Sequence, residues 1–183
     1  MPIRVNSTAT WLTIAYCTAF LCASANGKTL FDEDFDNPQK RWEEIAIQLP
    51  APPQRANLLS FYASPTTTTK FEIDTKSISV GEDGVVRYIL VATSASHARN
   101  ISYEGIRCAS YERKLYAFGQ TDGSWTRSRR DQWEPIQGFA ANRHHAALFK
   151  EYFCMETAVA GDAKDIVYRL KNKRTILGAQ WNP

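Results

Sequence analysis

Residues 99–119, RNISYEGIRCASYERKLYAFG, decide the fold of this chain. Two runs of apolar and aromatic residues lie on either side of a short polar turn, and such runs are typical of paired β-strands. The first run, residues 101–109, contains Cys108. We expect these two strands to form the centre of a sheet.

The alternation of side chains within the first run predicts an irregularity. Ile106 and Cys108 share one face of a strand, whereas the apolar residues before them point to the other face. Gly105 lies where a β-bulge could shift the register, and we expect a bulge there. Without the bulge, Glu104 would face the core and would require Arg107 or another base as its partner.

Residues 85–94, VVRYILVATS, are the strongest strand candidate because β-branched and aromatic residues dominate them. Apolar side chains fall on both faces, so we expect a central strand whose second face is covered by a helix. Further strand candidates are residues 45–49 before Pro50, 58–63, 71–74 and 78–80. Asp122 and Gly123 predict a hairpin turn that leads to Trp125.

The apolar period becomes helical after Gly138. Residues 142–154 begin at a potential N-cap, Asn142, and end at Cys154. The apolar stripe of this helix consists of His145, Leu148, Phe149, Tyr152 and Phe153. Residues 162–171 predict a second amphipathic helix with Ile166, Val167 and Leu170 on its apolar side.

Together these elements predict an α+β fold, a twisted antiparallel sheet of about six strands with the helix of residues 142–154 packed on one face. We expect this single domain to span residues 42–154. A flexible acidic arm at residues 26–41 precedes it. A C-terminal extension at residues 155–183 contains the second helix.

The first residues of the chain predict a cleaved secretory signal peptide. An apolar run at residues 11–21 follows a single basic residue, Arg4, and ends before a small-x-small triplet that closes at Ala25. The run is about half the roughly 20 residues that span a bilayer. We expect cleavage after Ala25 and no transmembrane anchor thereafter, with a retained N-terminal helix as the alternative.

The cysteine count favours one disulfide. Cys17 and Cys22 would leave with the signal peptide, so Cys108 and Cys154 would remain as a pair in an oxidising compartment. A bridge between them would contribute roughly 4 kcal/mol in the chain-entropy model. The alternative is a metal-binding or nucleophilic cysteine, although neither residue stands in a CxxC cluster.

Charge and motifs exclude several functions. The full chain has a net charge of +3, and loss of Arg4 with the signal peptide leaves about +2, too little to predict nucleic acid as the main partner. The sequence has no GxSxG elbow, Gly-rich phosphate loop or HExxH helix. We therefore expect no cofactor, no bound metal and no motif-defined catalytic site.

A set of basic residues is the best candidate for binding. Two of its members, Arg127 and Arg129, would project from one face of a strand. The set consists of Arg127, Arg129, Arg130, Arg143 and His144. Such a set could bind an anionic partner, but the sequence favours a solvated surface paired with Asp131 and Glu134.

A catalytic alternative would use residues that are distant in sequence. Glu104, Arg107 and His144 could form the site of a small hydrolase if one pocket held all three. His145 lies on the apolar stripe of the helix, so we expect it to be structural and His144 to be exposed. Adjacent helical residues point about 100° apart, so both histidines could not easily ligate one metal.

Several motifs resemble the CNP1-like family of exported bacterial proteins. They are residues 102–108 (SYEGIRC), 112–119 (ERKLYAFG), 122–125 (DGSW), Trp133, 142–145 (NRHH) and 151–154 (EYFC), together with residues 42–50. The resemblance covers residues 42–154, and its motifs are specific to the family and not to a chemistry. It implies that the two cysteines and residues 142–145 act as a structural unit.

The order of the elements is also similar to that of the surface adhesin E family, an antiparallel sheet packed on a C-terminal helix. That similarity implies binding of host or envelope macromolecules and transfers no binding residue. We therefore expect a non-catalytic interaction module of the periplasm or envelope, periplasmic or secreted through its signal peptide. The alternatives are a surface-exposed adhesin-like protein and the small hydrolase.

Overall fold

The structure, a computed structural model, describes residues 42–138 and 142–180. The predicted signal peptide, its cleavage site after Ala25 and the predicted acidic arm lie outside these residues. Among the helices of the described ranges, none has the length and apolar character that crossing a bilayer requires.

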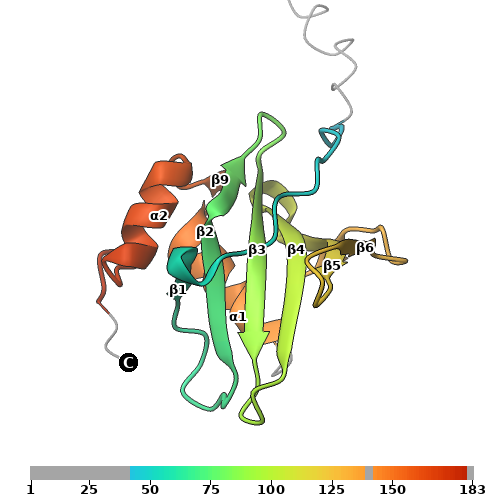
Figure 1. The fold of residues 1–183 in the computed structure, drawn as a ribbon. Coiled ribbons are helices and arrows are strands. Elements are labelled where there is room, and N and C mark those ends of the chain that lie inside the picture. Colours follow the sequence, from blue (N-terminus) through green and yellow to red (C-terminus); the bar gives the residue numbers. More distant parts are fainter. Residues whose placement is uncertain (1–41, 139–141, 181–183) are drawn as a thin grey trace, which may run out of the picture. The chain divides into compact units, whose positions relative to one another are not determined.

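An antiparallel sheet of seven strands forms the centre of the fold, as the sequence predicted (Figure 1). Six strands follow one another in the order β1 to β6, and β7 pairs with β5 beyond the end of β6. Their bounds are β1 Leu58–Ser60, β2 Lys70–Val80, β3 Val85–Thr93, β4 Arg99–Arg107, β5 Glu112–Gly119, β6 Trp125–Arg127 and β7 Glu134–Pro135.

Strand β3 is the central strand, which confirms the prediction from its composition. Residues 85–91 are all buried. Tyr88 and Leu90 pack into the larger hydrophobic cluster of the domain, whereas Ile89 and Val91 pack into a second cluster on the other face. Alternate side chains of a strand point to opposite faces, so β3 contributes to two separate cores.

Helices cover the face that carries Tyr88. The segments α1 (Arg143–Ala147) and η4 (a π-helix, Leu148–Phe153) bury all five residues of the predicted apolar stripe. Asn142 holds the N-cap position, but its side chain makes no capping hydrogen bond. Helix α2 (Ala163–Lys171) is capped by the preceding residue, Asp162, and adds Ile166 and Leu170 to the same core.

Short elements connect the strands and helices. They are η1 (Arg55–Asn57), η2 (Cys108–Ser110), β8 (Cys154–Met155) and β9 (Ala158–Val159), the last two forming a small antiparallel pair. The predicted helix therefore ends at Phe153, one residue before Cys154.

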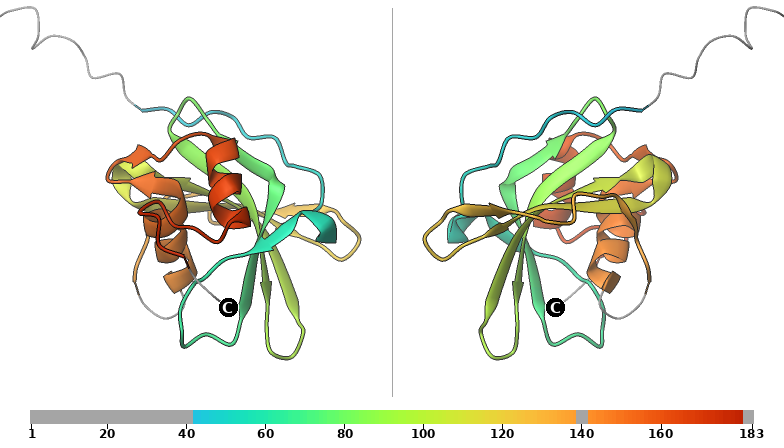
Figure 2. Two further views of the ribbon diagram at one scale, coloured as in Figure 1. Left: turned by 90° about the vertical axis from the view of Figure 1, so that its left-hand side faces the viewer. Right: turned by 90° about the vertical axis from the view of Figure 1, so that its right-hand side faces the viewer.

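The opposite face of the sheet is covered by extended chain (Figure 2). The prediction that a helix covers the second face of β3 was therefore wrong. The predicted strand at residues 45–49 was also wrong, because residues 42–50 join no strand. Backbone groups of a sheet point along its plane, so a segment lying over a face cannot join the ladder. Side chains hold it instead: Ile47 and Leu49 pack into the second cluster, and Trp42 Nε1 donates to Asp83 O at 2.8 Å.

The predicted bulge lies in a different strand. Strands β3 and β4 pair without a shift through Gly105, whereas the shift occurs in β5, where Tyr103 pairs with Ala117 and Glu104 with Leu115. Tyr116 is the extra residue. A Cβ at Gly105 would lie 2.5 Å from the Tyr116 hydroxyl, so the glycine is required for close approach of Tyr116 and not for a bulge.

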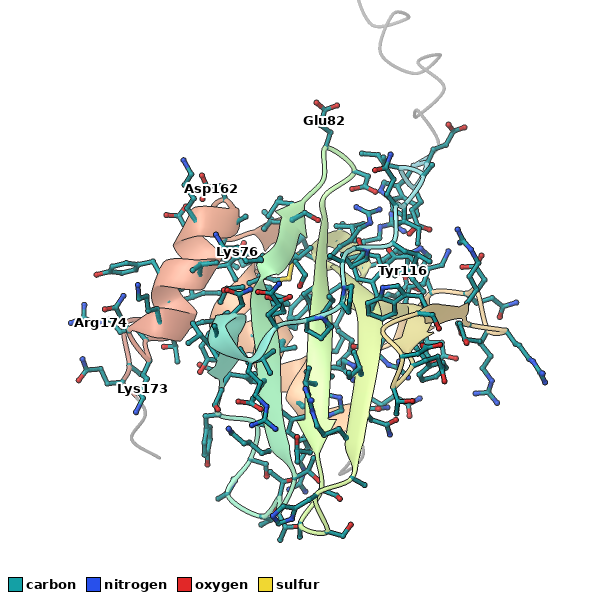
Figure 3. All side chains as sticks on the ribbon, viewed as in Figure 1. Lys76, Glu82, Tyr116, Asp162, Lys173 and Arg174 are labelled. Carbon is teal, nitrogen blue, oxygen red and sulfur yellow. A yellow bond between two sulfur atoms is a disulfide. The ribbon has the colours of Figure 1, made fainter. Side chains whose placement is uncertain are left out.

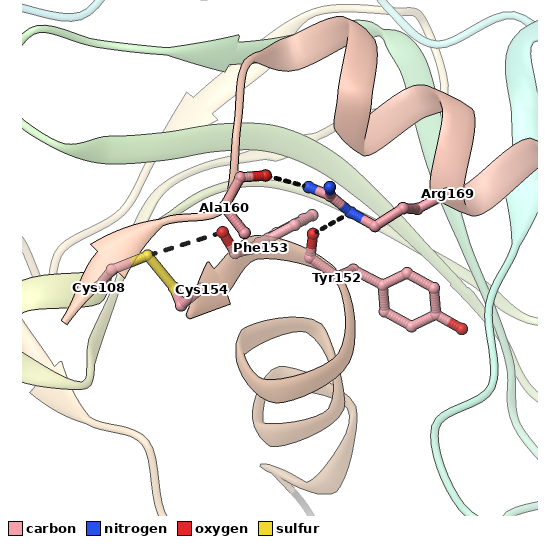
Figure 4. Close-up of a disulfide and its surroundings, with 6 residues drawn as sticks. All are labelled: Cys108, Tyr152, Phe153, Cys154, Ala160 and Arg169. Atoms are coloured by element: carbon pink, nitrogen blue, oxygen red, sulfur yellow. Dashed lines mark hydrogen bonds between the residues drawn. A yellow bond between two sulfur atoms is a disulfide. The ribbon is translucent and has the colours of Figure 1, made fainter. Parts of the chain in front are cut away.

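The predicted disulfide joins Cys108 and Cys154 (Figure 4). It links η2, just after β4, to β8, just after η4, and both cysteines are buried. Arg169 of α2 donates to the backbone oxygen of Tyr152 at 3.0 Å and to that of Ala160. The bridge and Arg169 together fix the end of η4 against the sheet and α2.

We predict that the double substitution Cys108→Ala with Cys154→Ala lowers the free energy of unfolding by about 4 kcal/mol. Opening a loop of 46 residues returns chain entropy to the unfolded state. Urea denaturation of the oxidised protein and the variant measures the difference. Wild type unfolded and refolded in reductant is the control and should match the variant. Equal unfolding free energies would contradict the prediction.

Candidate functional site

The buried carboxylate of Glu104 is the centre of a polar network on the helix-covered face. Its Oε2 accepts hydrogen bonds from Tyr88 Oη at 3.1 Å and pairs with His145 Nε2 at 2.7 Å, while Oε1 accepts from Ser102 Oγ at 2.7 Å. Glu104 therefore does face the core, in the arrangement expected without a bulge at Gly105. Its basic partner is His145 and not Arg107.

The network keeps Glu104 ionised in the core. Burial alone would raise the pKa of its carboxyl, but the charge and hydrogen bond of His145 and the hydroxyl of Ser102 outweigh burial and lower the pKa to about 2. The hydroxyl of Tyr88 is fully buried, and burial beside Glu104 raises its pKa. Among the described residues, His145 Nδ1 has no hydrogen-bond partner. This arrangement is characteristic of a structural network more than of a site open to substrate.

His144 is half-buried, so the expectation that it is exposed was wrong. Its ring stacks on Phe71 of β2, with centroids 4.3 Å apart and planes at 11°. Burial and the neighbouring His145 lower its pKa to about 3, which leaves the ring neutral at neutral pH. His144 can therefore offer packing and a hydrogen bond to a ligand but no positive charge.

The structure does not bring the three predicted hydrolase residues together. Glu104 points to the helices. Arg107 is three residues further along the strand, so its side chain points to the opposite face of the sheet. The Arg107 guanidinium lies 3.7 Å from the ring centroid of Trp42 and 3.8 Å from the carboxylate of Glu112. His144 lines a hollow with Arg143 and Phe71, and neither Glu104 nor Arg107 belongs to the lining of that hollow.

The predicted basic set divides into two groups. Arg127 ends β6, and Arg129 and Arg130 follow it; all three are exposed and make no ion pair within the described residues. The acids expected to pair with them bind elsewhere. Asp131 pairs with Lys114 at 2.7 Å, and Glu134 pairs with Arg113 at 3.0 Å.

Arg143 and His144 form the second group, at the start of α1. They line a hollow of about 230 Å³ with Phe71 and the hydroxyl-rich loop that follows β1. Arg143 Nη1 donates to Thr66 Oγ1 at 2.9 Å and to Ser64 Oγ at 3.3 Å. Because β2 lies near one edge of the sheet and β6 at the other, the two groups do not form one patch.

A second polar network, which sequence reasoning missed, lies on the face covered by residues 42–50. Glu44 accepts hydrogen bonds from Lys114 Nζ at 2.8 Å, Tyr116 Oη at 2.6 Å and Trp133 Nε1 at 3.2 Å. Arg87 lies 3.7 Å from Glu44 and donates through both terminal nitrogens to Asp83. The signal was present in the sequence, because an arginine within the apolar run of β3 requires an acidic partner.

A hollow of about 210 Å³ opens above this network. Its lining includes Glu44, Lys114, Tyr116 and Arg127. Figure 3 labels Tyr116 on this side of the sheet, at the opposite edge from α2. Burial and the hydrogen bond to Glu44 raise the pKa of Tyr116, so the hydroxyl stays protonated as a donor. The exposed Arg127 therefore lies at the same hollow as Glu44, Lys114 and Tyr116, whose polar groups bond to one another.

Metal coordination has no support in the described part of the chain. No group of three or more His, Cys, Asp or Glu side chains there is placed to hold an ion.

These features define a disulfide-bridged α+β domain with one helical face, one face covered by extended chain, and two polar networks centred on Glu104 and Glu44. The chain belongs to the CNP1-like family, whose sequence model matches residues 37–171, well over half of the chain. This finding confirms the resemblance drawn from the sequence motifs.

One curated relative is "Cryptic neisserial protein 1" of Neisseria gonorrhoeae, which is 33% identical over 118 residues. The match covers 57% of this chain and 57% of the relative, so the chain spans little more than half the length of that protein. No solved structure matches significantly, so the similarity to the surface adhesin E family stays a prediction.

We predict that Glu104→Ala lowers the free energy of unfolding at pH 7 by roughly 3–5 kcal/mol, because two buried partners, Tyr88 and His145, and the partly buried Ser102 lose their acceptor. Tyr88→Phe removes one neutral donor and should cost only about 1 kcal/mol.

Folding lowers the pKa of Glu104 from 4.5 to about 2. The advantage of wild type over Glu104→Ala should therefore be complete above pH 4.5 and decline as the pH falls towards 2. Urea titrations across this range test it, and a constant difference would contradict it.

We predict a second pH effect at His144. Its pKa falls from 6.5 in the unfolded chain to about 3 in the folded protein, so the unfolded state binds the proton first. Stability should be complete above pH 6.5 and fall below it by up to about 1.4 kcal/mol per pH unit. His144→Phe keeps a ring against Phe71 and removes the titration. Its unfolding free energy should vary less between pH 6.5 and 4.5 than that of wild type, and parallel curves would refute this role.

Proposed function

We propose that this protein is exported and acts as a non-catalytic binding module of the cell envelope, which engages an anionic macromolecule through Arg127, Arg129 and Arg130. Export is supported by the predicted signal peptide and by the disulfide, because disulfides persist in oxidising compartments. We place the domain in the periplasm, or outside the cell after secretion.

The observation that carries the proposal is the free charge of the three arginines. They are exposed at β6 and in the loop that follows it, and the nearby acids have other partners. The hairpin that bears Arg127 projects from the sheet (Figure 2). Arginine guanidinium groups recognise carboxylates and phosphates through paired hydrogen bonds, so this surface suits an anionic partner.

The polar groups of the core favour binding over catalysis. Glu104 and Glu44 are both engaged by several donors from the protein itself. Such groups stabilise the fold and are not free to transfer a proton to a substrate. Arg107 packs on Trp42 and Glu112 instead of joining Glu104 and His144, so the hydrolase hypothesis lacks a shared site.

The surface-exposed, adhesin-like alternative differs in location and not in chemistry. Cleavage of the protein by protease added to intact cells would favour it, and protection until the outer envelope is permeabilised would favour a periplasmic module.

We predict that the mature chain binds envelope extract in a salt-sensitive manner, and that Arg127→Ala, Arg129→Ala and Arg130→Ala together reduce capture at least tenfold. Exposed charges act over about 10 Å at 0.1 M salt, so added salt should have a similar effect. The experiment is a pull-down with purified protein, followed by identification of the captured molecule.

The control removes three exposed cations elsewhere, through Lys164→Ala, Lys171→Ala and Arg174→Ala on and after α2. Arg174 lies at the other side of the domain from β6 (Figure 3). This variant has the same net charge as the first. Equal loss in both variants would show a net-charge effect, and retention of the same partner by the first variant would refute the proposed surface.

A further inference from the structure

A mainly apolar hollow lies between α1, the loop after β1 and the chain after α2, away from the proposed arginine surface. Its volume is about 520 Å³, within the range of sites for small organic ligands. The walls come from four separate parts of the chain, residues 62–65, Gly138, residues 143–152 and residues 175–180. Tyr62, Ala63 and Pro65 form the wall on the side of the loop.

The helix wall carries both cations and small apolar residues. Arg143, Ala146, Ala147 and Lys150 all line the hollow, the first three from α1 and Lys150 from η4. Tyr152 of the core stripe also lines the hollow, and Ala146 packs against the larger core cluster. The two alanines have small side chains, which leave room between the two cations.

Hydrogen bonds hold the guanidinium of Arg143 in place, but no described acidic residue pairs with its charge. Its Nη1 donates to the hydroxyls of Ser64 and Thr66, which are neutral acceptors, and its remaining donors have no partner among the described residues. Lys150 is exposed and makes no ion pair with any described residue. Glu151 also lines the hollow, so the lining carries one more cation than anions.

We propose that this hollow binds an amphipathic organic anion. The hydrocarbon part lies on Ala146, Ala147 and Tyr62, where it removes apolar surface from water. The anionic headgroup, a carboxylate or a phosphate monoester, pairs with the guanidinium of Arg143, which the two hydroxyls already hold in place. Lys150, which also lines the hollow, adds a second, weaker attraction for the headgroup.

The test is isothermal titration calorimetry on the mature chain with decanoate and decyl phosphate, which share a chain length and differ in headgroup. Decanol and decyltrimethylammonium are the neutral and cationic counterparts. We expect saturable binding of at least one anion, about tenfold or more tighter than that of decanol, and none of the cation. Amide resonances of Ala63, Ala146 and Ala147 should shift in NMR spectra on addition of the anion.

Three variants locate the site. Arg143→Gln should weaken binding of the anion about tenfold, and Lys150→Gln should weaken it less. Ala147→Leu should block binding by filling the hollow while leaving the melting temperature within a few degrees of wild type, because Ala147 is not part of either core cluster. Lys164→Gln removes an exposed cation outside the hollow and is the matched control, expected to bind like wild type.

Equal affinity for decanol, or unchanged affinity in Arg143→Gln, would overturn the assignment of the anionic headgroup. Absence of saturable binding by both anions, or full binding by Ala147→Leu, would overturn the site itself. The triple arginine variant at β6 should bind the anion as wild type does, so failure of the envelope-binding proposal would leave this one intact.

Discussion

The rest of the fold depends on keeping the buried carboxylate of Glu104 satisfied. An unpaired charge in the core would cost several kcal/mol, so its donors must arrive together. Tyr88 comes from β3, Ser102 from β4 itself and His145 from α1. A slip of β4 by one residue would move Glu104 to the other face, so the same contact fixes both the strand register and the position of the helix.

On the opposite face, too, a carboxylate with several donors attaches the covering layer to the sheet. There the extended segment of residues 42–50 takes the place of a second helical layer. Glu44 reaches Lys114, Tyr116 and Trp133, and Ile47 and Leu49 add apolar contact. An extended segment makes few backbone bonds to a sheet face, so its attachment depends on side chains such as Glu44. The domain therefore carries one polar network within each covering layer.

The engagement of charged groups within the two covering layers indicates where a partner can bind. The charged groups inside both layers are engaged by the protein, whereas Arg127 and its neighbours, and Arg143 beside the apolar hollow, make no ion pair with a described residue. The disulfide fixes the end of η4 to the strand that carries Glu104. The helix face that lines the hollow is thereby held on a rigid support, which favours a preformed binding site.

The sequence by itself determined the elements whose signals are local or can be counted. The apolar stripe from His145 to Phe153, the central position of β3 and the pairing of Cys108 with Cys154 followed from periodicity, composition and cysteine number. Only the tertiary structure decided which face Glu104 points to, how deeply His144 is buried and what residues 42–50 do. The reason is distance along the chain: the contact of Glu104 with His145 spans 41 residues and that of Glu44 with Lys114 spans 70. A local pattern shows that a buried charge needs a partner, but only the assembled fold determines which residue supplies it.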